Sequence, residues 1–428
     1  MVKHSYKAYD EAVYHHHLQG RLACYFIRKE VFAKTYVTLT APIGSVHRNV
    51  QLNGEVIQLP AGTAHFLEHK VFEKDGEDLS RFFALHDANI NAFTSAHQTT
   101  YLFSSTNHLF ENVQALTSMF FLPHFTPSGI EKEKGIILEE LNMHNDDPYY
   151  LQYYALLENL FHHHPIKEEI LGTRETIENF TIEDLKRAHQ SFYAPEKATL
   201  VIVGDHEPEA LFETLEKTII LGPPASKNVQ LIPIDEPQEV VSTATTMNAD
   251  VLTPNVLFGV KLPLIEGTKE TVVVHQLRQS IVLDLVFGLS SSTYERWLDE
   301  GIVNDSYGVE TAFDSQTAHA LIGSETHQPE VFIEQLQVRI KELDTSLDEA
   351  DFIRVHRQMI GTFIQSLDSL EFVAHQFTRY IQEGINLYDL LTLAQTITFE
   401  SLMPVAKAMK ASERWSYVWL TPRHVKEN

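Results

Sequence analysis

Hydrophobic and polar positions in the first half of the chain follow two different periods. Residues 21–42 and 90–105 alternate or run apolar and are rich in aromatic and β-branched side chains, which is typical of strands. Apolar residues recur at helical spacing in four other segments, 62–74, 128–145, 148–161 and 182–192. The pattern therefore predicts a half that mixes helices and strands.

A stretch with several prolines divides the chain. It begins with Leu221-Gly222-Pro223-Pro224, after a predicted strand at 201–205 and a predicted helix near 207–217, and it continues past Pro237. We predict three parts: an N-terminal domain 1–220, a linker 221–240 and a C-terminal domain 241–428.

The same order of elements returns beyond the linker. Strands are predicted near 255–261 and 316–324, and helices at 272–288, 328–342, 347–366 and 399–410. In each half, a Ser or Thr stands where a helix N-cap belongs, within 125–134 and within 344–352. We therefore predict an α+β fold of two related domains, each a mostly antiparallel sheet packed with helices.

Composition and charge exclude several classes of protein. The 428 residues are 43% hydrophobic and 21% charged, so the chain can bury large cores. Lys and Arg number 33 against 58 Asp and Glu, and the net charge of −25 excludes a general nucleic-acid binder. Because Cys24 is the only cysteine, a metal site has to use His and carboxylates. The runs 15–17 and 162–164 are three His each and are interpreted as exposed or loop residues.

Targeting signals are not evident in the sequence. The first ten residues lack the apolar region of a secretory signal, and no stretch reaches ~18 uninterrupted apolar residues. We therefore expect the protein in the cytoplasm.

The strongest chemical signal is the segment 62–72, which contains the pattern H-x-x-E-H. On a helix, His65 and His69 lie four residues apart on one face, where both rings can bind one ion, and Glu68 lies beside them. This pattern is the inverted form of the zinc-peptidase helix. Zinc bound there lowers the pKa of its bound water toward ~7, and Glu68 is the candidate to take the water's proton.

A His-rich chain can also produce this pattern by chance. The neighbouring Phe66, Leu67 and Val71 argue against chance, because they predict a buried helix. Burial of two His and a Glu without partners would cost several kcal/mol, and a metal ion removes that cost.

A third ligand is expected from the predicted helix around 131–141, which contains four carboxylates. On a helical wheel, Glu140 and Glu133 border the apolar stripe, whereas Glu139 faces away. We therefore predict Glu140 as the ligand and Glu133 as a carboxylate that orients a His or the water. The alternative for Glu133 is a solvated charge near the helix N-terminus.

Further motifs accompany these residues along nearly the whole chain. With them, the sequence resembles the M16 metallopeptidases (pitrilysin or inverzincin family), and within that family the bacterial YmfH-like and AlbF-like members. The motifs are Asn91-Ala92-Phe93-Thr94-Ser95, Thr100-Tyr101, His164-Pro165, Leu171-Gly172-Thr173, Phe192-Tyr193-Ala194-Pro195 and Val203-Gly204-Asp205.

The resemblance implies both a fold and a set of roles. It implies one Zn²⁺ per chain bound by His65, His69 and Glu140, with Glu68 as the base. It also implies a LuxS/M16-like duplication, usually assembled as dimers that close around an unfolded peptide. Residues 91–95 match the strand that receives the substrate as an added strand. The alternative is an ordinary strand with Phe93 in the core.

One departure from the family pattern concerns the second half. Family members often carry an Arg and a Tyr there that bind the substrate, but Ser292 and Asn304 stand at these positions. Arg296 and Tyr307 are close but out of register. Loss of hydrogen-bond donors directed at the negative charge that develops during the reaction costs on the order of a hundredfold or more in rate. We therefore predict a heterodimer in which a related M16-like subunit supplies the Arg and Tyr.

The leading hypothesis is a zinc-dependent endopeptidase that hydrolyses extended peptides or small unfolded proteins. In it, Glu68 activates the zinc-bound water and then protonates the leaving amine. Two alternatives stay open. One is a scaffold or peptide-binding subunit without proteolysis, and the other is a dedicated maturation factor in elongation factor P modification or peptide-antibiotic processing.

Overall fold

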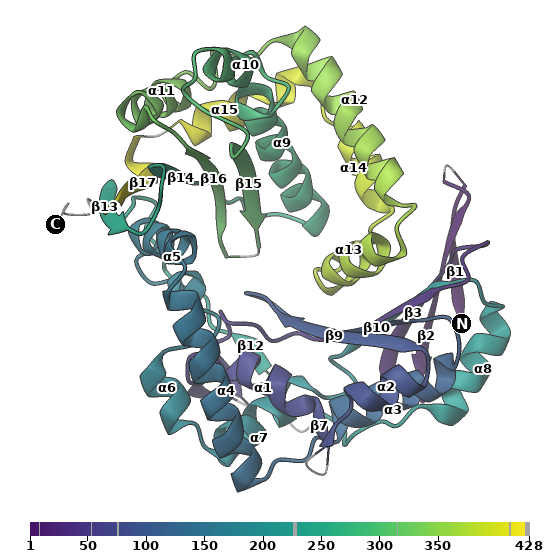
Figure 1. Cartoon of the computed structure of the whole chain (residues 1–428). Helices are drawn as coiled ribbons and strands as arrows, with labels where there is room; N and C mark the ends of the chain where they lie inside the picture. Colours follow the sequence, from purple (N-terminus) through teal and green to yellow (C-terminus); the bar gives the residue numbers. More distant parts are fainter. Residues whose placement is uncertain are drawn as a thin grey trace. The chain divides into compact units, whose positions relative to one another are not determined.

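The computed structural model describes residues 1–7, 9–52, 54–74, 77–225, 229–314, 316–410 and 412–423, which form two compact units (Figure 1). Each unit is built from three separate segments of the chain. Unit 1 comprises Met1–Leu141, Glu168–Ile232 and Gln365–Tyr388, whereas unit 2 comprises Asn142–Lys167, Pro233–Ile364 and the residues from Asp389 onward.

Unit 1 is built on a seven-stranded sheet. All neighbouring strands pair antiparallel except β3 and β11, which are parallel. Strand β9 lies at one edge. The order is β1 (Val2–Tyr6), β2 (Glu11–Leu18), β3 (Leu22–Arg28), β11 (Thr199–Gly204), β4 (Thr35–Ala41), β10 (Thr99–Ser105) and β9 (Ala88–Thr94). Two small sheets accompany it: β12 (Val229–Leu231), β5 (Asn49–Leu52) and β6 (Glu55–Gln58), and β7 (Glu73–Lys74) with β8 (Glu77–Asp78).

Helices of unit 1 pack with the sheet around a continuous apolar core. Strand residues such as Val37, Leu39 and Ile202 are fully buried and pack with helix residues such as Phe66 and Leu116. Burial of these side chains is the main contribution that holds the unit together. The helices are α1 (Thr63–Val71), α2 (Ser80–Leu85), α3 (Leu109–Phe121), most of α4 (Pro127–Asn145), α6 (Arg174–Asn179), α7 (Ile182–Phe192), α8 (Pro208–Thr218) and α13 (Leu370–Gln382).

Unit 2 has a five-stranded sheet and a core of its own. Its strand order is β13 (Ala244–Ala249), β17 (Trp415–Pro422), β14 (Asn255–Lys261), β16 (Ala318–Glu325) and β15 (Gly308–Phe313). Its helices are α5 (Pro148–Leu160), α9 (Lys269–Phe287), α10 (Ser292–Asp299), α11 (Pro329–Lys341), most of α12 (Glu349–Ser366), α14 (Asp389–Gln395) and α15 (Met403–Met409), with the short 3₁₀ helices Pro165–Lys167, Phe399–Ser401 and Ser412–Arg414.

One segment of unit 2 is long and apolar enough to cross a membrane, judged by length and composition. It is Lys269–Asp299, which contains α9, and 56% of its most apolar window is buried inside the structure. The core helix of a globular unit has the same properties. The buried residues Ile281, Leu285 and Phe287 belong to the core of unit 2.

The two sheets repeat one topology. Strands β3, β11, β4, β10 and β9 of unit 1 correspond in spatial order to β13, β17, β14, β16 and β15 of unit 2. The correspondence also holds along the chain, and in both sheets the first of these pairs is parallel and the others are antiparallel. The predicted fold of two related α+β domains is therefore confirmed.

Each sheet is covered on one side by a helix from a distant part of the sequence. In unit 1, α13 contacts β4 and β11, and Thr378 hydrogen-bonds Thr38 (Oγ1 to Oγ1, 3.0 Å). In unit 2, α5 contacts β14 and β17, and Gln152 Nε2 donates to Val418 O (2.9 Å). The compact units therefore differ from the predicted sequence domains at 142–167 and 365–388.

Local details also differ from the sequence interpretation. The His15-His16-His17 run is not in a loop but in strand β2, where His15 and His16 are half-buried. In the other run, His164 is buried. The α12 N-terminus is capped by Asp348, whose Oδ1 accepts from the amide of Ala350 (2.8 Å). A predicted Ser or Thr cap is therefore wrong there.

Candidate metal centre

Helix α1 begins at a close approach between two backbone segments. Gly62 precedes the helix with a φ of 86°, and a Cβ on it would lie 2.2 Å from Leu171 O. Gly172 has a φ of 85°, and a Cβ there would lie 2.4 Å from Ala61 O. Only glycine fits both positions, since it tolerates a positive φ and has no side chain. The two glycines thus fix where α1 starts.

The position of α1 brings His65 and His69 onto one face. Phe66, Leu67 and Val71 are buried in the core of unit 1, so the helix cannot rotate without exposing them. The two imidazole ring centroids lie 4.6 Å apart.

Helix α4 supplies the carboxylates. Thr126 caps its start, with Oγ1 accepting from the amide of Gly129 (3.1 Å). Ile130, Ile137 and Leu141 are buried in the core and fix the rotation of the helix. Glu133 is buried on the same side, Glu140 is half-buried, and Glu139 is exposed. This burial follows the helical wheel drawn from the sequence.

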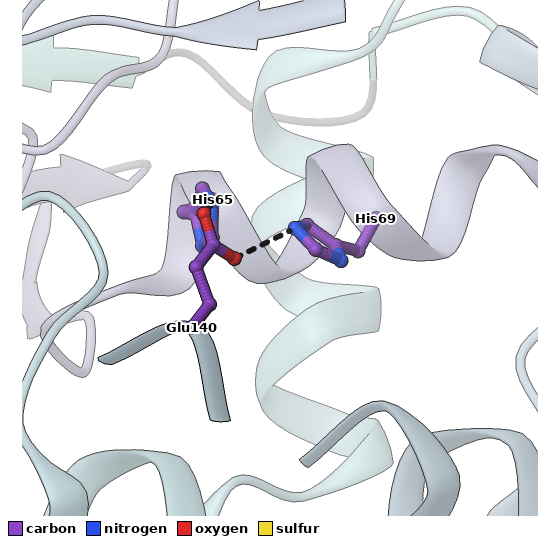
Figure 2. Close-up of side chains that lie close together, drawn as sticks. All are labelled: His65, His69 and Glu140. Atoms are coloured by element: carbon purple, nitrogen blue, oxygen red, sulfur yellow. Dashed lines mark ion pairs between the residues drawn. The ribbon is translucent and has the colours of Figure 1, made fainter. Parts of the chain in front are cut away.

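The structure brings His65, His69 and Glu140 together (Figure 2). His65 Nε2 lies 3.6 Å from Glu140 Oε1, and His69 Nε2 lies 3.5 Å from Glu140 Oε2. Ligand atoms about 2.0–2.1 Å from a tetrahedral zinc ion lie about 3.3 Å from one another. Both separations are close to this value, and one donor atom of each of the three residues lies within 4.8 Å of the other two, so the cluster could hold a metal ion.

Glu133 contacts the back of one imidazole. Its Oε1 lies 2.9 Å from His69 Nδ1, which leaves Nε2 of the same ring directed at Glu140. A carboxylate on the other ring nitrogen is the usual partner of a metal-binding His, because it fixes the tautomer and orientation of the ring. The structure therefore brings Glu133 to the position at which it can orient His69.

The electrostatics of the cluster favour a positive charge. Burial of the ring opposes this charge, but the hydrogen bonds that His69 donates to the carboxylates of Glu133 and Glu140 raise its pKa to about 9. The hydrogen bonds of His65 and His69 hold the pKa of Glu140 far below its ordinary value. In the metal-free protein, a proton on His69 thus supplies part of the charge that a divalent cation would supply.

His65 presents its Nε2 to Glu140, whereas its Nδ1 is buried and has no hydrogen-bond partner among the described residues. Two imidazole nitrogens and one carboxylate are a donor set that catalytic zinc sites use, with a fourth position open to water or substrate. The residues present therefore fit a zinc ion.

Glu68 lies on α1 between the two His and is half-buried. Its Oε2 accepts a hydrogen bond from Thr94 Oγ1 at 2.6 Å, and Thr94 is the last residue of β9. Sequence reasoning placed Thr94 in a substrate-binding strand and did not find this contact with Glu68. No spacing rule connects residues 68 and 94, so only the fold could show it.

The predicted substrate strand lies at the sheet edge. Residues 91–94 belong to β9, which pairs only with β10 within the described chain, and Ser95 follows it in the turn. Asn91 is exposed, and its Oδ1 accepts from the amide of Ala92 (2.9 Å). Phe93 is half-buried, and its ring lies 5.4 Å from that of His375 on α13. Phe93 is thus not a full core residue.

The inverted zinc-peptidase order on α1, together with a carboxylate from a second helix and a duplicated α+β fold, defines the class of metallopeptidase-like proteins. Comparison with known families gives the same class. The description "Insulinase (Peptidase family M16)" matches residues 29–174, and "Peptidase M16 inactive domain" matches residues 179–359. The chain belongs to peptidase family M16, in which zinc proteases are known and inactive members also occur.

Individual relatives cover the whole chain. YmfH of Bacillus subtilis, described as an uncharacterized zinc protease, is 31% identical over 98% of this chain and 98% of its own length. An M16-like peptidase from Alicyclobacillus acidocaldarius has a TM-score of 0.91 at 28% identity, with 96% of this chain and 99% of that chain covered. A protease from Helicobacter pylori shares the fold, with a TM-score of 0.82 at 19% identity over 96% of this chain and 99% of that chain.

Proposed function

We propose that the protein is a zinc-dependent endopeptidase that hydrolyses extended peptides or small unfolded proteins. The observation that carries the proposal is the convergence of His65, His69 and Glu140, with the Glu68 carboxylate on the same helix. Family membership supports it, because relatives such as YmfH are described as zinc proteases.

The proposed mechanism assigns one task to each residue. His65, His69 and Glu140 would hold one Zn²⁺ per chain, and Glu133 would orient His69. The bound ion supplies Lewis acidity to the scissile carbonyl and acidifies a water molecule. Glu68 takes a proton from the attacking water and then donates it to the leaving amine.

The edge strand β9 supports the proposed substrate class. Among the described strands, β9 pairs with β10 alone, so its outer main-chain groups face the sheet edge, where an extended peptide can pair largely independently of its sequence. Asn91 Oδ1 already accepts from the Ala92 amide, so a substrate carbonyl that pairs with this amide has to displace it. Strand pairing needs an extended main chain whose own amides and carbonyls are unpaired, so the proposed substrate is a chain that is already unfolded.

We also propose that the enzyme works with a related subunit. Tyr307 cannot serve as a free donor, because its buried hydroxyl donates to Phe287 O (2.7 Å). Asn304 is occupied in a turn, where Oδ1 accepts from the amide and hydroxyl of Ser306 (2.8 and 2.6 Å). A related M16-like subunit would supply the missing Arg and Tyr. The proposed location of this heterodimer is the cytoplasm.

The test measures zinc and peptide cleavage together. Purified protein should contain about one zinc per chain, and Glu68→Gln should retain zinc but lose cleavage of a quenched fluorescent peptide. Each sample is assayed alone and mixed with a co-purifying M16-like subunit. The mixture is expected to cleave the peptide faster than the two subunits do separately. Zinc without cleavage in every mixture would contradict the proposal and favour a scaffold or peptide-binding role.

A further inference from the structure

Thr94 lies where the candidate base and the candidate substrate strand meet. Its hydroxyl donates to Glu68 Oε2 at 2.6 Å, and its main chain ends strand β9. Within the described chain, this is the only hydrogen bond that reaches the Glu68 carboxylate. The other carboxylate oxygen, Oε1, accepts no hydrogen bond from the residues that the structure describes.

The direction of the Thr94 main chain follows from the turn after β9. The Ser95 amide donates to Gln98 O (2.9 Å), so Ser95 and Gln98 form a hydrogen-bonded pair. Such pairs alternate with non-hydrogen-bonded pairs in an antiparallel ladder, so Thr94 and its partner Thr99 form a non-hydrogen-bonded pair. The amide and carbonyl of Thr94 therefore point away from β10, toward the free edge of the sheet.

The hydrogen bonds of the neighbouring hydroxyls show which acceptor receives the proton of the Thr94 hydroxyl. Thr99 Oγ1 lies 3.5 Å from Thr94 Oγ1, but it donates its own proton to Ile43 O at 2.8 Å. A hydroxyl has a single proton, and the short contact of Thr94 is with the Glu68 carboxylate. Thr94 is therefore a donor to Glu68, and this bond to an ionised acceptor is a strong one.

We propose that Thr94 is a positioning residue that fixes Glu68 relative to the peptide paired with β9. Its hydroxyl anchors Oε2 and so leaves Oε1 as the atom that takes the proton from water. Its main-chain groups lie at the edge that receives the substrate strand. One residue thus sets the distance between the scissile bond and the base. This inference rests on the proposed peptidase function and adds a second role to Thr94.

Three variants of the full-length chain test the inference, with the subunit mixture used where it is needed for turnover. Thr94→Val removes the hydroxyl at nearly constant volume, and Thr94→Ser keeps it. Thr40→Val is the matched control, since it removes a buried hydroxyl of the same sheet that contacts Thr100 (2.9 Å) and not Glu68. The measurements are zinc content, kcat and KM for one peptide, and the Glu68 rotamers in crystals of each variant.

Thr94→Val is expected to keep its zinc and its KM within about twofold while kcat falls on the order of ten- to a hundredfold, because a misplaced base loses rate rather than binding. Thr94→Ser should recover most of kcat, and Thr40→Val should match the parent protein. Glu68 should occupy one rotamer in the parent and Thr94→Ser crystals and several in Thr94→Val.

Two results would overturn the inference. The first is a Thr94→Val protein with unchanged kcat and one Glu68 rotamer. The second is a loss confined to KM, which would mean that Thr94 acts only on the substrate. A chain without any peptidase activity would refute the proposed function instead, and the Glu68 rotamers would still decide whether Thr94 anchors this carboxylate.

Discussion

The two units share one topology, but among the described residues only unit 1 brings together a His and Glu cluster that could hold a metal ion. In unit 1, His65, Glu68 and His69 lie on α1, the first helix after strand β4. In unit 2, the first helix after the corresponding strand β14 is α9, and it carries His275, Arg278 and Gln279 at the same spacing.

The difference lies in what the two side chains at i and i+4 contact. His65 and His69 of α1 meet the carboxylate of Glu140. His275 Nε2 and Gln279 Nε2 of α9 both contact Pro263 O, at 3.1 and 2.8 Å. A backbone carbonyl thus contacts both side chains in unit 2, where the carboxylate of Glu140 does so in unit 1. Helical spacing alone therefore does not make a candidate metal site, and a second helix has to bring a carboxylate.

Alanine substitution of one His in each unit should give the largest contrast. His69→Ala removes a proposed ligand, so zinc content should fall from about one per chain to near zero and cleavage by roughly a thousandfold or more. His275→Ala should leave zinc content unchanged. Elemental analysis after gel filtration checks both, and zinc loss in the His275 variant alone would reverse the assignment of the site.

Removal of the carboxylate behind His69 should have a smaller effect. Glu133→Gln weakens the orientation of the ring, so zinc affinity should fall about ten- to a hundredfold. Competition with a fluorescent chelator measures this change. Glu139→Gln is the matched control, because Glu139 is exposed on the same helix. Equal affinities for the two variants would show that Glu133 is only a buried charge.

Two histidines, His69 of unit 1 and His319 of unit 2, should give the metal-free protein opposite pH dependences. The pKa of His69 is raised to about 9 by Glu133 and Glu140 against the effect of burial. Its stabilisation is therefore present below the unfolded pKa of about 6.5 and is lost as the pH rises through about 9. Burial lowers the pKa of His319 in unit 2 to about 4, so the unfolded state binds its proton more readily. Stability should therefore fall as the pH drops from about 6.5 toward 4.

Thermal unfolding between pH 4 and 9.5 measures these two effects, and each should shift the Tm by several degrees. Glu133→Gln should flatten the alkaline side of the profile. His319→Phe should make the acid side less steep, because it removes one of the rings whose pKa burial lowers to about 4. A profile that neither substitution changes would contradict the cited shifts.

The sequence predicted the parts of the site that depend on local spacing. His65 and His69 share a face because the helix has a fixed period, and the burial of Ile137 and Leu141 placed Glu140 beside the core. The contact between Thr94 and Glu68 could not be predicted in this way, since it depends on how β9 lies against α1.

The same limit applies to the fold. Periodicity predicted most helices, the central strands of both sheets and the duplication, but an amphipathic pattern does not specify which sheet a helix covers. Helix α13 was therefore not predicted to cover β4 and β11 of unit 1. Strand β2 was missed because its three consecutive His hide the alternation that marks a half-buried strand.

Anomalous diffraction at the zinc edge from crystals of the zinc-loaded protein would locate the metal ion. We expect one strong peak per chain, about 2.0–2.2 Å from Nε2 of His65, Nε2 of His69 and a carboxylate oxygen of Glu140. Peaks only elsewhere, or no peak with these three side chains still in mutual contact, would contradict this expectation.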